Sequence, residues 1–381
     1  MKKEAIVIGL GISGCAAARL LADAGYAVSC FERQSYIGGN LCEEKRANGQ
    51  LIQTYGPHIF HTDREDIYSF LKRFGNFYPY AHRVLADCSG VEVPVPLNFT
   101  SLSLLFKPDR AEKLKKKLTA RFGKDQRVAL SSLLSSGDTD LIELGKFIDA
   151  NIQTPGINRV SEDDFRACDD SYMFDTFVET GDSDVYYRDK YQATPILGFT
   201  ALLESMLNHP NISYYINEDA FSRLSLIEET GSFLFDGIPF RGPIVYTPSV
   251  DILFNFCYGH LPFRTSKITY EDVKQDYYLK SAVTTRVGKD GFLRISESKY
   301  FTLIDTPGMT SICKESAYIS TTSGIGEPFE PDINSDSLKM HHLYVQEAKK
   351  YSSLYLLGRL ACYKNLSIAE CISQAMELLP L

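Results

Sequence analysis

The sequence predicts an α/β fold with added helical and antiparallel-sheet segments, and three patterns carry this prediction. A short apolar strand near the N-terminus runs directly into a glycine-rich turn and a helix-like stretch. Further helix-like stretches lie within residues 99–175, and several other segments alternate apolar and polar side chains as half-buried strands do. The chain has 381 residues, which suits two or three domains.

The N-terminal segment has the pattern of a βαβ unit that binds a dinucleotide. The apolar run at residues 5–8 leads into Gly-Leu-Gly-Ile-Ser-Gly, a GxGxxG motif, and a helix-like stretch and a second strand then end at Glu32. In such units the glycines let the backbone approach a pyrophosphate, the helix N-terminus faces the phosphates, and the acid accepts hydrogen bonds from ribose. We therefore predict that the dinucleotide is bound by Gly9, Gly11, Ser13, Gly14 and Glu32.

The stretch after Glu32 extends this motif. It contains a Gly-Gly pair, which gives a second piece of bare backbone that can lie against a cofactor; an ordinary Gly-Gly turn is the alternative. The combination resembles the extended motif of amine-oxidase-like FAD proteins, in which this stretch continues the diphosphate and ribose site. We therefore favour FAD as the cofactor, with Arg33, Gly39 and Asn40 among its ligands.

Composition and charge disfavour several other functions. Lys and Arg total 40 while Asp and Glu total 48, so the net charge is −8, and a dedicated nucleic-acid binder would carry a basic excess. No run approaches about 18 apolar residues, so we expect no membrane association. Nine scattered cysteines without a C-x-x-C pair fit buried thiols in a reducing cytoplasm, and no residue spacing suggests a metal site.

Residues 55–62 carry the most specific signal. They read Tyr-Gly-Pro-His-Ile-Phe-His-Thr, which taken alone is a Gly-Pro turn with two incidental histidines. After a βαβ unit of the FAD type, this segment resembles one found in bacterial UDP-galactopyranose mutases. The chain is similar to that family, in order, also at residues 83–86, 94–98, 186–192, 292–301 and 358–364.

This resemblance implies a Rossmann-like FAD-binding domain with an inserted small helical domain and an antiparallel β-sheet domain. The FAD-binding domain would be discontinuous and comprise residues 1–85, 193–265 and 305–381. The helical domain would span residues 99–175, and the substrate sheet would comprise residues 86–98, 176–192 and 266–304. A homodimer is also expected from the family.

The resemblance further implies the chemistry. The family interconverts pyranose and furanose forms of a sugar nucleotide, with a reduced FAD whose N5 attacks the anomeric carbon and displaces the nucleoside diphosphate. The cofactor carries the difficult step, so no protein nucleophile or metal is required. An external reductant must reduce the flavin.

Particular residues receive roles from the resemblance. His58 and Arg294 would be catalytic: His58 lies against the flavin, and Arg294 contacts both the flavin and the leaving diphosphate, for which a guanidinium is suited. Further contacts to the cofactor are expected from Tyr55, Gly56, His58, Ile59, Arg359, Tyr363, Leu366 and Ser367. Substrate contacts are expected from Arg294, Tyr187, Tyr191 and Asn98.

The chain departs from the family mainly at the sugar-nucleotide site. It contains no tryptophan, so the family's uracil-stacking Trp is missing from residues 151–157. Glu179 stands where the family has a mobile-loop arginine, with Arg166 or Arg188 as possible substitutes, and residues 327–329 and 365–367 lack a family tyrosine and aspartate. A related flavoenzyme with an altered substrate in a specialised biosynthetic pathway and a non-catalytic flavin-binding protein therefore remain as alternatives.

Overall fold

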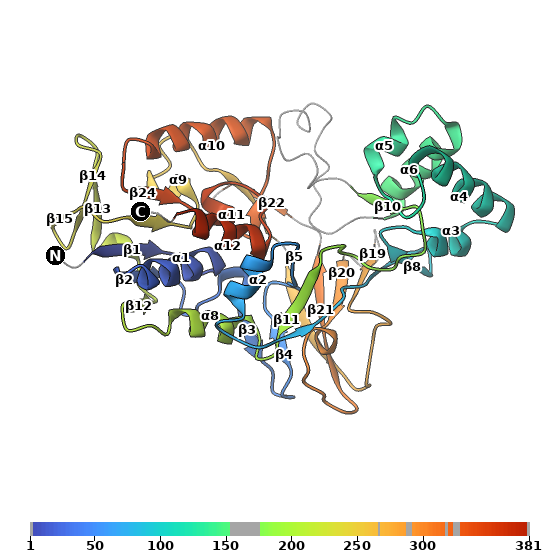
Figure 1. The fold of residues 1–381 in the computed structure, drawn as a ribbon, viewed down its shortest axis with the longest axis horizontal. Coiled ribbons are helices and arrows are strands. Elements are labelled where there is room, and N and C mark those ends of the chain that lie inside the picture. Colours follow the sequence, from blue (N-terminus) through green and yellow to red (C-terminus); the bar gives the residue numbers. More distant parts are fainter. Residues whose placement is uncertain are drawn as a thin grey trace.

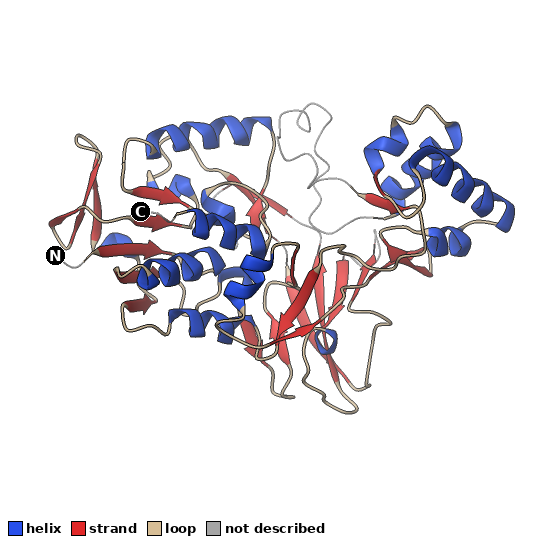
Figure 2. Cartoon of the chain, viewed as in Figure 1, coloured by secondary structure: helices blue, strands red, loops and turns tan. Residues whose placement is uncertain are grey.

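The computed structural model describes residues 3–152, 176–265, 267–286, 292–316, 319–322 and 328–378. A parallel sheet with flanking helices lies at one end of the molecule, near the marked N and C ends, and a group of helices lies at the other end (Figure 1). A second, larger sheet lies between them, as the colouring by secondary structure shows (Figure 2). The predicted α/β fold with a helical segment and an additional sheet is confirmed.

The parallel sheet is built from strands that are far apart in the sequence. Its order is β12-β2-β1-β16-β24, and every neighbouring pair is parallel. The strands are β1 (Glu4–Ile8), β2 (Ala27–Glu32), β12 (Ile212–Ile216), β16 (Ile244–Tyr246) and β24 (Leu354–Leu356). The central strand β1 is an almost purely apolar run because both faces of a parallel sheet are covered.

Helix α1 (Ile12–Asp23) packs close to this sheet. Its residues 13–18 are all buried and include three successive alanines, so little side-chain bulk separates the helix from the strands. The helix contacts α8 (Phe199–Leu207) and α12 (Ile368–Glu377), and the interface forms a core that includes Leu21, Phe199 and Ile372. This core fixes the N-terminal end of α1 above the sheet.

The second sheet has six strands in the order β18-β21-β20-β19-β7-β8. The pairs are antiparallel except β19 and β7, which run parallel, so the sheet is mixed rather than purely antiparallel. The strands are β7 (Val84–Cys88), β8 (Val91–Val95), β18 (Ile268–Val273), β19 (Val283–Arg286), β20 (Phe292–Glu297) and β21 (Thr310–Ser316).

The helical group lies beyond the edge formed by β8. It comprises α3 (Phe99–Leu105), α4 (Pro108–Phe122), α5 (Leu130–Leu134) and α6 (Thr139–Asn151). The short antiparallel ribbon of β9 (Arg127–Ala129) and β10 (Phe177–Glu179) closes this group. Its core of leucines, among them Leu114, Leu133 and Leu144, is continuous with the core under β7 and β8.

Smaller elements complete the fold. A three-stranded sheet contains β5 (Phe60–Thr62), β11 (Tyr191–Pro195) and β6 (Phe77–Pro79). The remaining strands are β3 (Glu43–Lys45), β4 (Leu51–Gln53), β13 (Leu224–Ile227), β14 (Ser232–Phe235), β15 (Ile238–Phe240), β17 (Pro262–Thr265), β22 (Ile319–Thr322) and β23 (Glu330–Pro331). The other α-helices of the described residues are α2 (Glu65–Leu71), α9 (Val250–Leu253), α10 (Ser335–Ala348) and α11 (Gly358–Ala361). In the described part of the chain, no helix is long and apolar enough to cross a membrane.

The observed strand pairing differs from the predicted boundaries in four places. Residues 84–85 were expected in the FAD-binding domain, but they belong to β7 of the mixed sheet. Residues 310–316 were expected in the FAD-binding domain, but β21 lies in the mixed sheet because it hydrogen-bonds to β18 and β20. Residues 177–179 pair with β9 of the helical group instead of the substrate sheet. Residues 191–192 were expected in the substrate sheet, but they pair with β5 in the three-stranded sheet. Residues 153–175 of the predicted helical domain lie outside the described residues.

Candidate functional site

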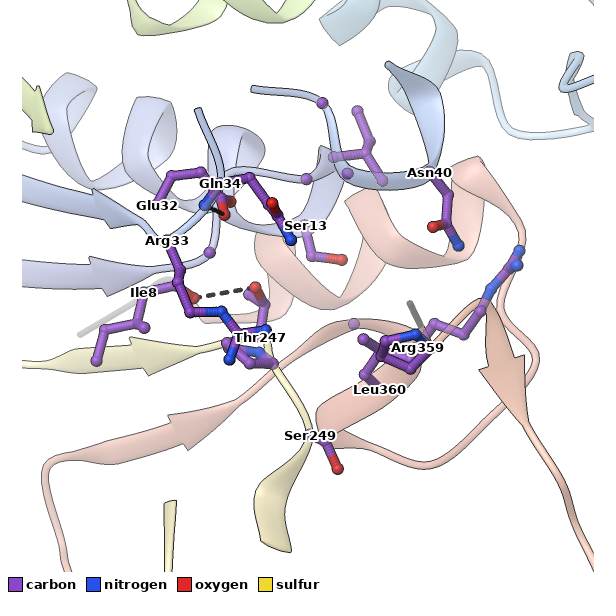
Figure 3. Close-up of a pocket in the computed structure, with 18 of the residues that line it drawn as sticks. Ile8, Ser13, Glu32, Arg33, Gln34, Asn40, Thr247, Ser249, Arg359 and Leu360 are labelled. Atoms are coloured by element: carbon purple, nitrogen blue, oxygen red, sulfur yellow. Dashed lines mark hydrogen bonds between the residues drawn. The ribbon is translucent and has the colours of Figure 1, made fainter. Parts of the chain in front are cut away.

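One long cavity lies at the carboxyl ends of the parallel strands. It encloses about 1420 Å³, including its open mouth, and its lining comes from the segments that follow β1, β2, β12, β16 and β24. Ligands of open α/β sheets bind at this edge, so the position alone marks a cofactor site. Figure 3 shows Glu32 and Arg33 toward one end of the cavity, and Asn40 and Arg359 toward the other.

The glycines of the N-terminal motif act in two different ways. A Cβ atom at Gly14 would lie 1.9 Å from the carbonyl oxygen of Gly9, so only glycine lets α1 approach the end of β1. A Cβ at Gly11 would meet only the Gly38 carbonyl, at 3.9 Å, and Gly11 lines the cavity. The backbone at Gly11 is therefore bare on the side where a phosphate would lie. The motif fits a dinucleotide pyrophosphate.

The Gly38-Gly39 turn packs directly against this loop. The Gly38 amide donates to the Leu10 carbonyl at 2.8 Å, and Gly38 and Gly39 both have positive φ, of 114° and 53°. Glycine adopts such backbone angles without strain. The turn brings Gly39 and Asn40 to the cavity wall, so the two glycine motifs form one continuous surface.

Glu32 is held in place at the end of β2. Its carboxylate accepts hydrogen bonds from the backbone amides of Leu10 and Gln34, each at 2.8 Å. These bonds leave further lone pairs of the carboxylate oxygens free toward the cavity that Glu32 lines. This geometry suits an acceptor for ribose hydroxyls, as the sequence predicts.

The C-terminal segment closes the opposite wall. Gly358 has a φ of 82°, and a Cβ there would lie 2.7 Å from the Ser13 hydroxyl, so the start of α11 and the start of α1 meet closely at this glycine. The guanidinium of the next residue, Arg359, donates to the Leu366 carbonyl through Nε at 3.2 Å and Nη2 at 2.7 Å. Arg359 and Leu366 both line the cavity, and the fixed cation provides a charge for an anionic cofactor.

His58 lines the same cavity at the end where Tyr55 and Pro328 lie. Its backbone amide donates to the Gln53 side chain at 2.6 Å, and its Nδ1 lies 2.9 Å from the Gly56 carbonyl, which makes Nδ1 the protonated nitrogen. Burial, together with the charges of Arg359 and Arg294, lowers the pKa of His58 to about 3, although the bond to Gly56 opposes this. The imidazole is therefore neutral at physiological pH and keeps Nε2 as an acceptor.

Arg294 lies near this end of the cavity, although it is not among the cavity-lining residues. It projects from β20 and forms a buried ion pair with Glu315 of β21, whose side chain is only 1% exposed. A Cβ at Gly56 would lie 3.2 Å from the Arg294 guanidinium, so the loop that carries His58 packs on this ion pair. The structure thus brings His58 and Arg294 together, at the boundary between the parallel-sheet region and the mixed sheet.

An aromatic wall borders Arg294 on the side of the helical group. The ring of Tyr187 stacks on His61, with ring centroids 3.7 Å apart, and also faces His82 at 5.9 Å. Burial raises the pKa of Tyr187, and the neighbouring Arg294 charge opposes this rise, so the phenol and the guanidinium share one environment. His61, His82, Tyr186 and Tyr187 together form this aromatic wall.

Several predicted site residues have other positions. Asn98 is fully buried and caps α3; its amide donates to Ser183 and Asp184, and its oxygen accepts from Ser101. These bonds use its polar atoms within the protein, so Asn98 is a structural cap. Tyr191 lies in β11 with its ring against Tyr68, at a centroid distance of 4.9 Å.

The cofactor residues that do not line the cavity have identifiable structural contacts. The Tyr363 hydroxyl is buried and donates to the carbonyl of Pro262 at 2.5 Å, with Asp332 as a second acceptor at 3.0 Å. Ser367 caps α12 in a reciprocal arrangement with Glu370. Gly14 and Ile59 are buried in the core, and Gly56 packs against the Arg294 ion pair.

Glu179 is not an added charge at the site. Its side chain is fully buried and pairs with Arg127, at 2.7 Å, and with Arg188. Arg188 is thus engaged by Glu179, and the suggestion that it replaces the missing arginine does not fit this pairing. Arg166, residues 153–157 of the segment without Trp, and Glu327 lie outside the described residues.

Sequence reasoning missed several cavity residues. They follow strands β2, β12 and β16 or belong to the C-terminal helices, and they are Gln34, Tyr36, Glu218, Asp219, Ala220, Phe221, Thr247, Pro248, Ser249, Leu360, Ile368 and Cys371. Gln34, Tyr36 and Leu360 lie within stretches singled out from the sequence, and no motif marks the others. Their position at the ends of apolar strands was the available signal, since the carboxyl ends of parallel strands meet at one edge.

No group of three or more His, Cys, Asp or Glu side chains that could hold a metal ion occurs among the residues that the structure describes. The cavity lies at the edge of the parallel sheet where Rossmann-like domains bind ligands, and its walls contain glycines, the carboxylate of Glu32 and the guanidinium of Arg359. Its described lining offers no metal site. These residues fit a flavin dinucleotide.

Comparison with known proteins agrees with this geometry. A family model described as UDP-galactopyranose mutase matches residues 164–365, just over half of the chain, and one described as an NAD(P)-binding Rossmann-like domain matches residues 7–74. The chain is 26% identical to the dTDP-fucopyranose mutase of Escherichia coli, over 98% of this chain and 97% of that protein. It is 25% identical to a probable UDP-galactopyranose mutase of Klebsiella pneumoniae, over 98% and 93% of the two chains.

Solved structures show the same fold at low sequence identity. A reduced UDP-galactopyranose mutase superposes with a TM-score of 0.64 at 11% identity, covering 98% of this chain and 94% of that one. A putative protoporphyrinogen oxidase from Exiguobacterium has a TM-score of 0.63 at 14% identity, covering 99% and 98%.

The fold and the cavity together define a protein with a Rossmann-like dinucleotide-binding domain. Within that class, the chain belongs to the UDP-galactopyranose mutase family. It is therefore a member of a family of isomerases that act on sugar nucleotides.

Proposed function

We propose that this protein binds FAD in the cavity at the edge of the parallel sheet and, with the flavin reduced, interconverts the pyranose and furanose forms of a sugar nucleotide. The observation that carries the proposal is the continuity of the cavity. It extends from the acid at the end of β2, past the bare backbone of Gly11, to the neutral imidazole of His58 beside the Arg294 ion pair.

The residues of this chain would hold the cofactor at three points. Glu32 accepts hydrogen bonds from ribose, Gly11 and Gly39 leave room for the pyrophosphate, and Arg359 provides a nearby positive charge. The chemistry that FAD supplies when bound and reduced is a nucleophilic N5 atom able to attack an anomeric carbon. His58 offers Nε2 as a hydrogen-bond acceptor, because its Nδ1 proton is directed to Gly56.

Arg294 is the proposed binder of the substrate diphosphate. Its charge is permanent, and it lies where the cavity end meets the mixed sheet. The ion pair with Glu315 keeps the guanidinium oriented before substrate arrives. Because the Glu315 carboxylate uses some of the N–H donors of Arg294, it competes with the substrate diphosphate for them. The aromatic wall beside Arg294 is the proposed surface for the sugar, through Tyr187.

The nucleotide and the sugar are to be identified by screening. The E. coli relative is named for dTDP-fucopyranose and others for UDP-galactopyranose, so dTDP- and UDP-sugars are the first substrates to test. An external reductant is needed to bring the flavin to its active state, because ring isomerisation involves no net oxidation or reduction and so cannot supply electrons to the flavin. The homodimer stays a prediction that analytical ultracentrifugation tests.

The deciding experiment uses the purified protein with and without dithionite. UDP-, dTDP-, GDP- and CMP-sugars are incubated with it, and the furanose and pyranose forms are separated by chromatography. We expect FAD to copurify and turnover only after reduction. A protein that takes up no FAD contradicts the cofactor assignment, and a reduced FAD-loaded protein that converts none of these substrates contradicts the mutase function.

A further inference from the structure

A buried carboxylate joins the helical group to the segment that carries the aromatic wall. Glu179 lies in β10, and its side chain has no exposed surface. Its Oε1 accepts from Arg127 Nε at 2.7 Å, and its Oε2 pairs with Arg188. Arg127 belongs to β9 of the helical group, whereas Arg188 belongs to the loop before β11. One carboxylate thus holds cations from two separate parts of the chain.

The same two arginines also bind backbone carbonyl groups. Arg127 donates from Nη2 to the carbonyl of Tyr186 at 3.0 Å and to that of Val185 at 3.4 Å. Arg188 donates to the carbonyl of Asp125, at 3.2 Å, next to β9. Residues 185–188 are therefore held against the β9–β10 ribbon by bonds in both directions: Arg127 of the ribbon bonds this segment, and Arg188 of this segment bonds the ribbon. The planar guanidinium groups fix the directions of these bonds.

These bonds flank Tyr187 of the aromatic wall. Tyr187 lies between Tyr186 and Arg188, and its ring is stacked on His61 with an interplanar angle of 14°. At the edge of the same imidazole ring, His61 Nδ1 lies 3.1 Å from the Asp189 carboxylate. The loop is thus anchored at Arg188 and Asp189, so the ring of Tyr187 has little freedom to turn away from the aromatic wall.

Within the ion triad of Arg127, Glu179 and Arg188, the Glu179 side chain is fully buried, whereas that of Arg188 is 40% exposed. Taking the carboxylate out of water offsets much of the Coulombic gain, and packed apolar residues are often as stable in such a position. What a guanidinium–carboxylate pair adds is a fixed direction for each bond, which sets how neighbouring segments are placed. None of the three residues lines the cofactor cavity, and Arg127 bonds the backbone directly before Tyr187, which suits a role in placing that side chain.

We propose that Arg127, Glu179 and Arg188 form a positioning triad that holds Tyr187 in the substrate-binding orientation and so links the helical group to sugar-nucleotide binding. This inference rests on the proposed function of the site. The three residues touch neither cofactor nor substrate in this account. They act through the backbone of residues 185–188.

The test uses the FAD-loaded full-length protein and a double variant, Arg127→Met with Glu179→Gln. It removes one positive and one negative charge together, so no buried carboxylate is left unpaired, and the partly exposed Arg188 can turn to water. Arg127→Lys is the conservative variant, which keeps the charge but not the forked geometry. The matched control is Arg110→Met, which removes an ion pair of α4 with Asp140 and Glu143, elsewhere in the helical group.

Two readouts are needed: hydrogen–deuterium exchange of peptides that cover residues 183–192, and KM and kcat for the best substrate of the screen. We expect faster exchange in this segment and a KM raised on the order of 10- to 100-fold in the double variant, as for a misplaced binding group. The kcat value and FAD content should change little. Arg127→Lys should recover part of the KM, and Arg110→Met should match the wild-type protein in both readouts.

The outcomes separate the two proposals. Unchanged exchange in the double variant overturns the positioning role, whatever its KM, and faster exchange with an unchanged KM overturns the link to substrate binding. If the control variant raises KM as much as the double variant does, the effect reflects a general loosening of the helical group. That result also overturns the inference. If the wild-type protein converts no sugar nucleotide, the proposed function fails, and the exchange of residues 183–192 alone decides whether the triad positions the loop.

Discussion

Alanine substitutions at Gly14 and at Gly11 are predicted to have different effects. The first should destabilise the fold, and the second should weaken cofactor binding. Alanine at Gly14 would place Cβ 1.9 Å from the Gly9 carbonyl oxygen, where real contacts stay beyond 3.0 Å, so helix and strand must separate by about 1.1 Å. The obstacle is backbone, which has no rotamer to change. We expect Gly14→Ala to lower the free energy of unfolding by about 1–3 kcal/mol or more, the usual cost of overpacking a filled core.

Alanine at Gly11 would have a different result. The φ of −75° suits any residue, and the added methyl points into open space, so the unfolding free energy of the apoprotein should change by no more than about 1 kcal/mol. The methyl would occupy the surface meant for the pyrophosphate. A misfit of about 1–3 kcal/mol there weakens FAD binding by about 5- to 150-fold.

Both variants are measured by urea unfolding of the apoprotein and by flavin fluorescence during reconstitution with FAD. The expected pattern is a stability loss specific to Gly14→Ala and an affinity loss without a stability loss for Gly11→Ala. Wild-type FAD affinity in Gly11→Ala would show that the cofactor does not lie against this turn. Wild-type stability in Gly14→Ala would show that α1 is not packed on β1 as described.

Three further predictions concern other residues. Arg294→Lys should keep the charge beside Glu315 and the bound FAD, but lose about 100-fold in kcat/KM, because an ammonium cannot replace forked donors at the diphosphate; unchanged turnover contradicts the role of Arg294. Burial, with the charges of Arg294 and His61, lowers the pKa of His82 to about 3. Between pH 6.5 and pH 3 the unfolded chain therefore binds a proton at this residue that the folded chain does not, so the free energy of unfolding should fall by about 1.4 kcal/mol per pH unit. Urea unfolding at a series of pH values should show a shallower dependence of this free energy on pH in His82→Gln. The exposed-site control His342→Gln should keep the wild-type dependence. Asn98→Ala should lower the unfolding free energy by about 1–2 kcal/mol in thermal melts with KM unchanged, because the side chain caps α3; a raised KM would restore its predicted substrate contact.

Local motifs were the part of the site that the sequence predicted well. The spacing of Gly9, Gly11 and Gly14 predicts the geometry of the turn, because a tight turn, a bare backbone and close helix packing each need glycine. Glu32 follows from the same unit, since it ends the second strand of a βαβ pattern. His58 and Arg359 also line the cavity, although their segments were recognised by resemblance instead of by a physical pattern.

Side-chain direction was the part that the sequence did not reveal. Tyr363 and Ser367 lie in the correct segment, yet one side chain turns to the Pro262 carbonyl and the other caps a helix. For Asn98 a local signal existed: Asn-Phe-Thr-Ser followed by apolar residues is a helix-capping pattern. Glu179 had no such signal, because its partner Arg127 is 52 residues away and only the folded chain brings them together.

The parallel sheet has a consequence for the synthesis of the protein. Strand β24 and the cavity residues from Gly358 to Cys371 follow the other cavity segments in the sequence, and they close a site whose first wall lies at Ile8 and Gly9. Because the chain is synthesised from its N-terminus, this wall becomes available only after the residues up to Cys371 have been made. The helices α3 to α6, whose contacts are mostly local, can form much earlier. Cofactor loading is therefore expected to follow the synthesis of α12, and chains cut short before α11 should emerge colourless.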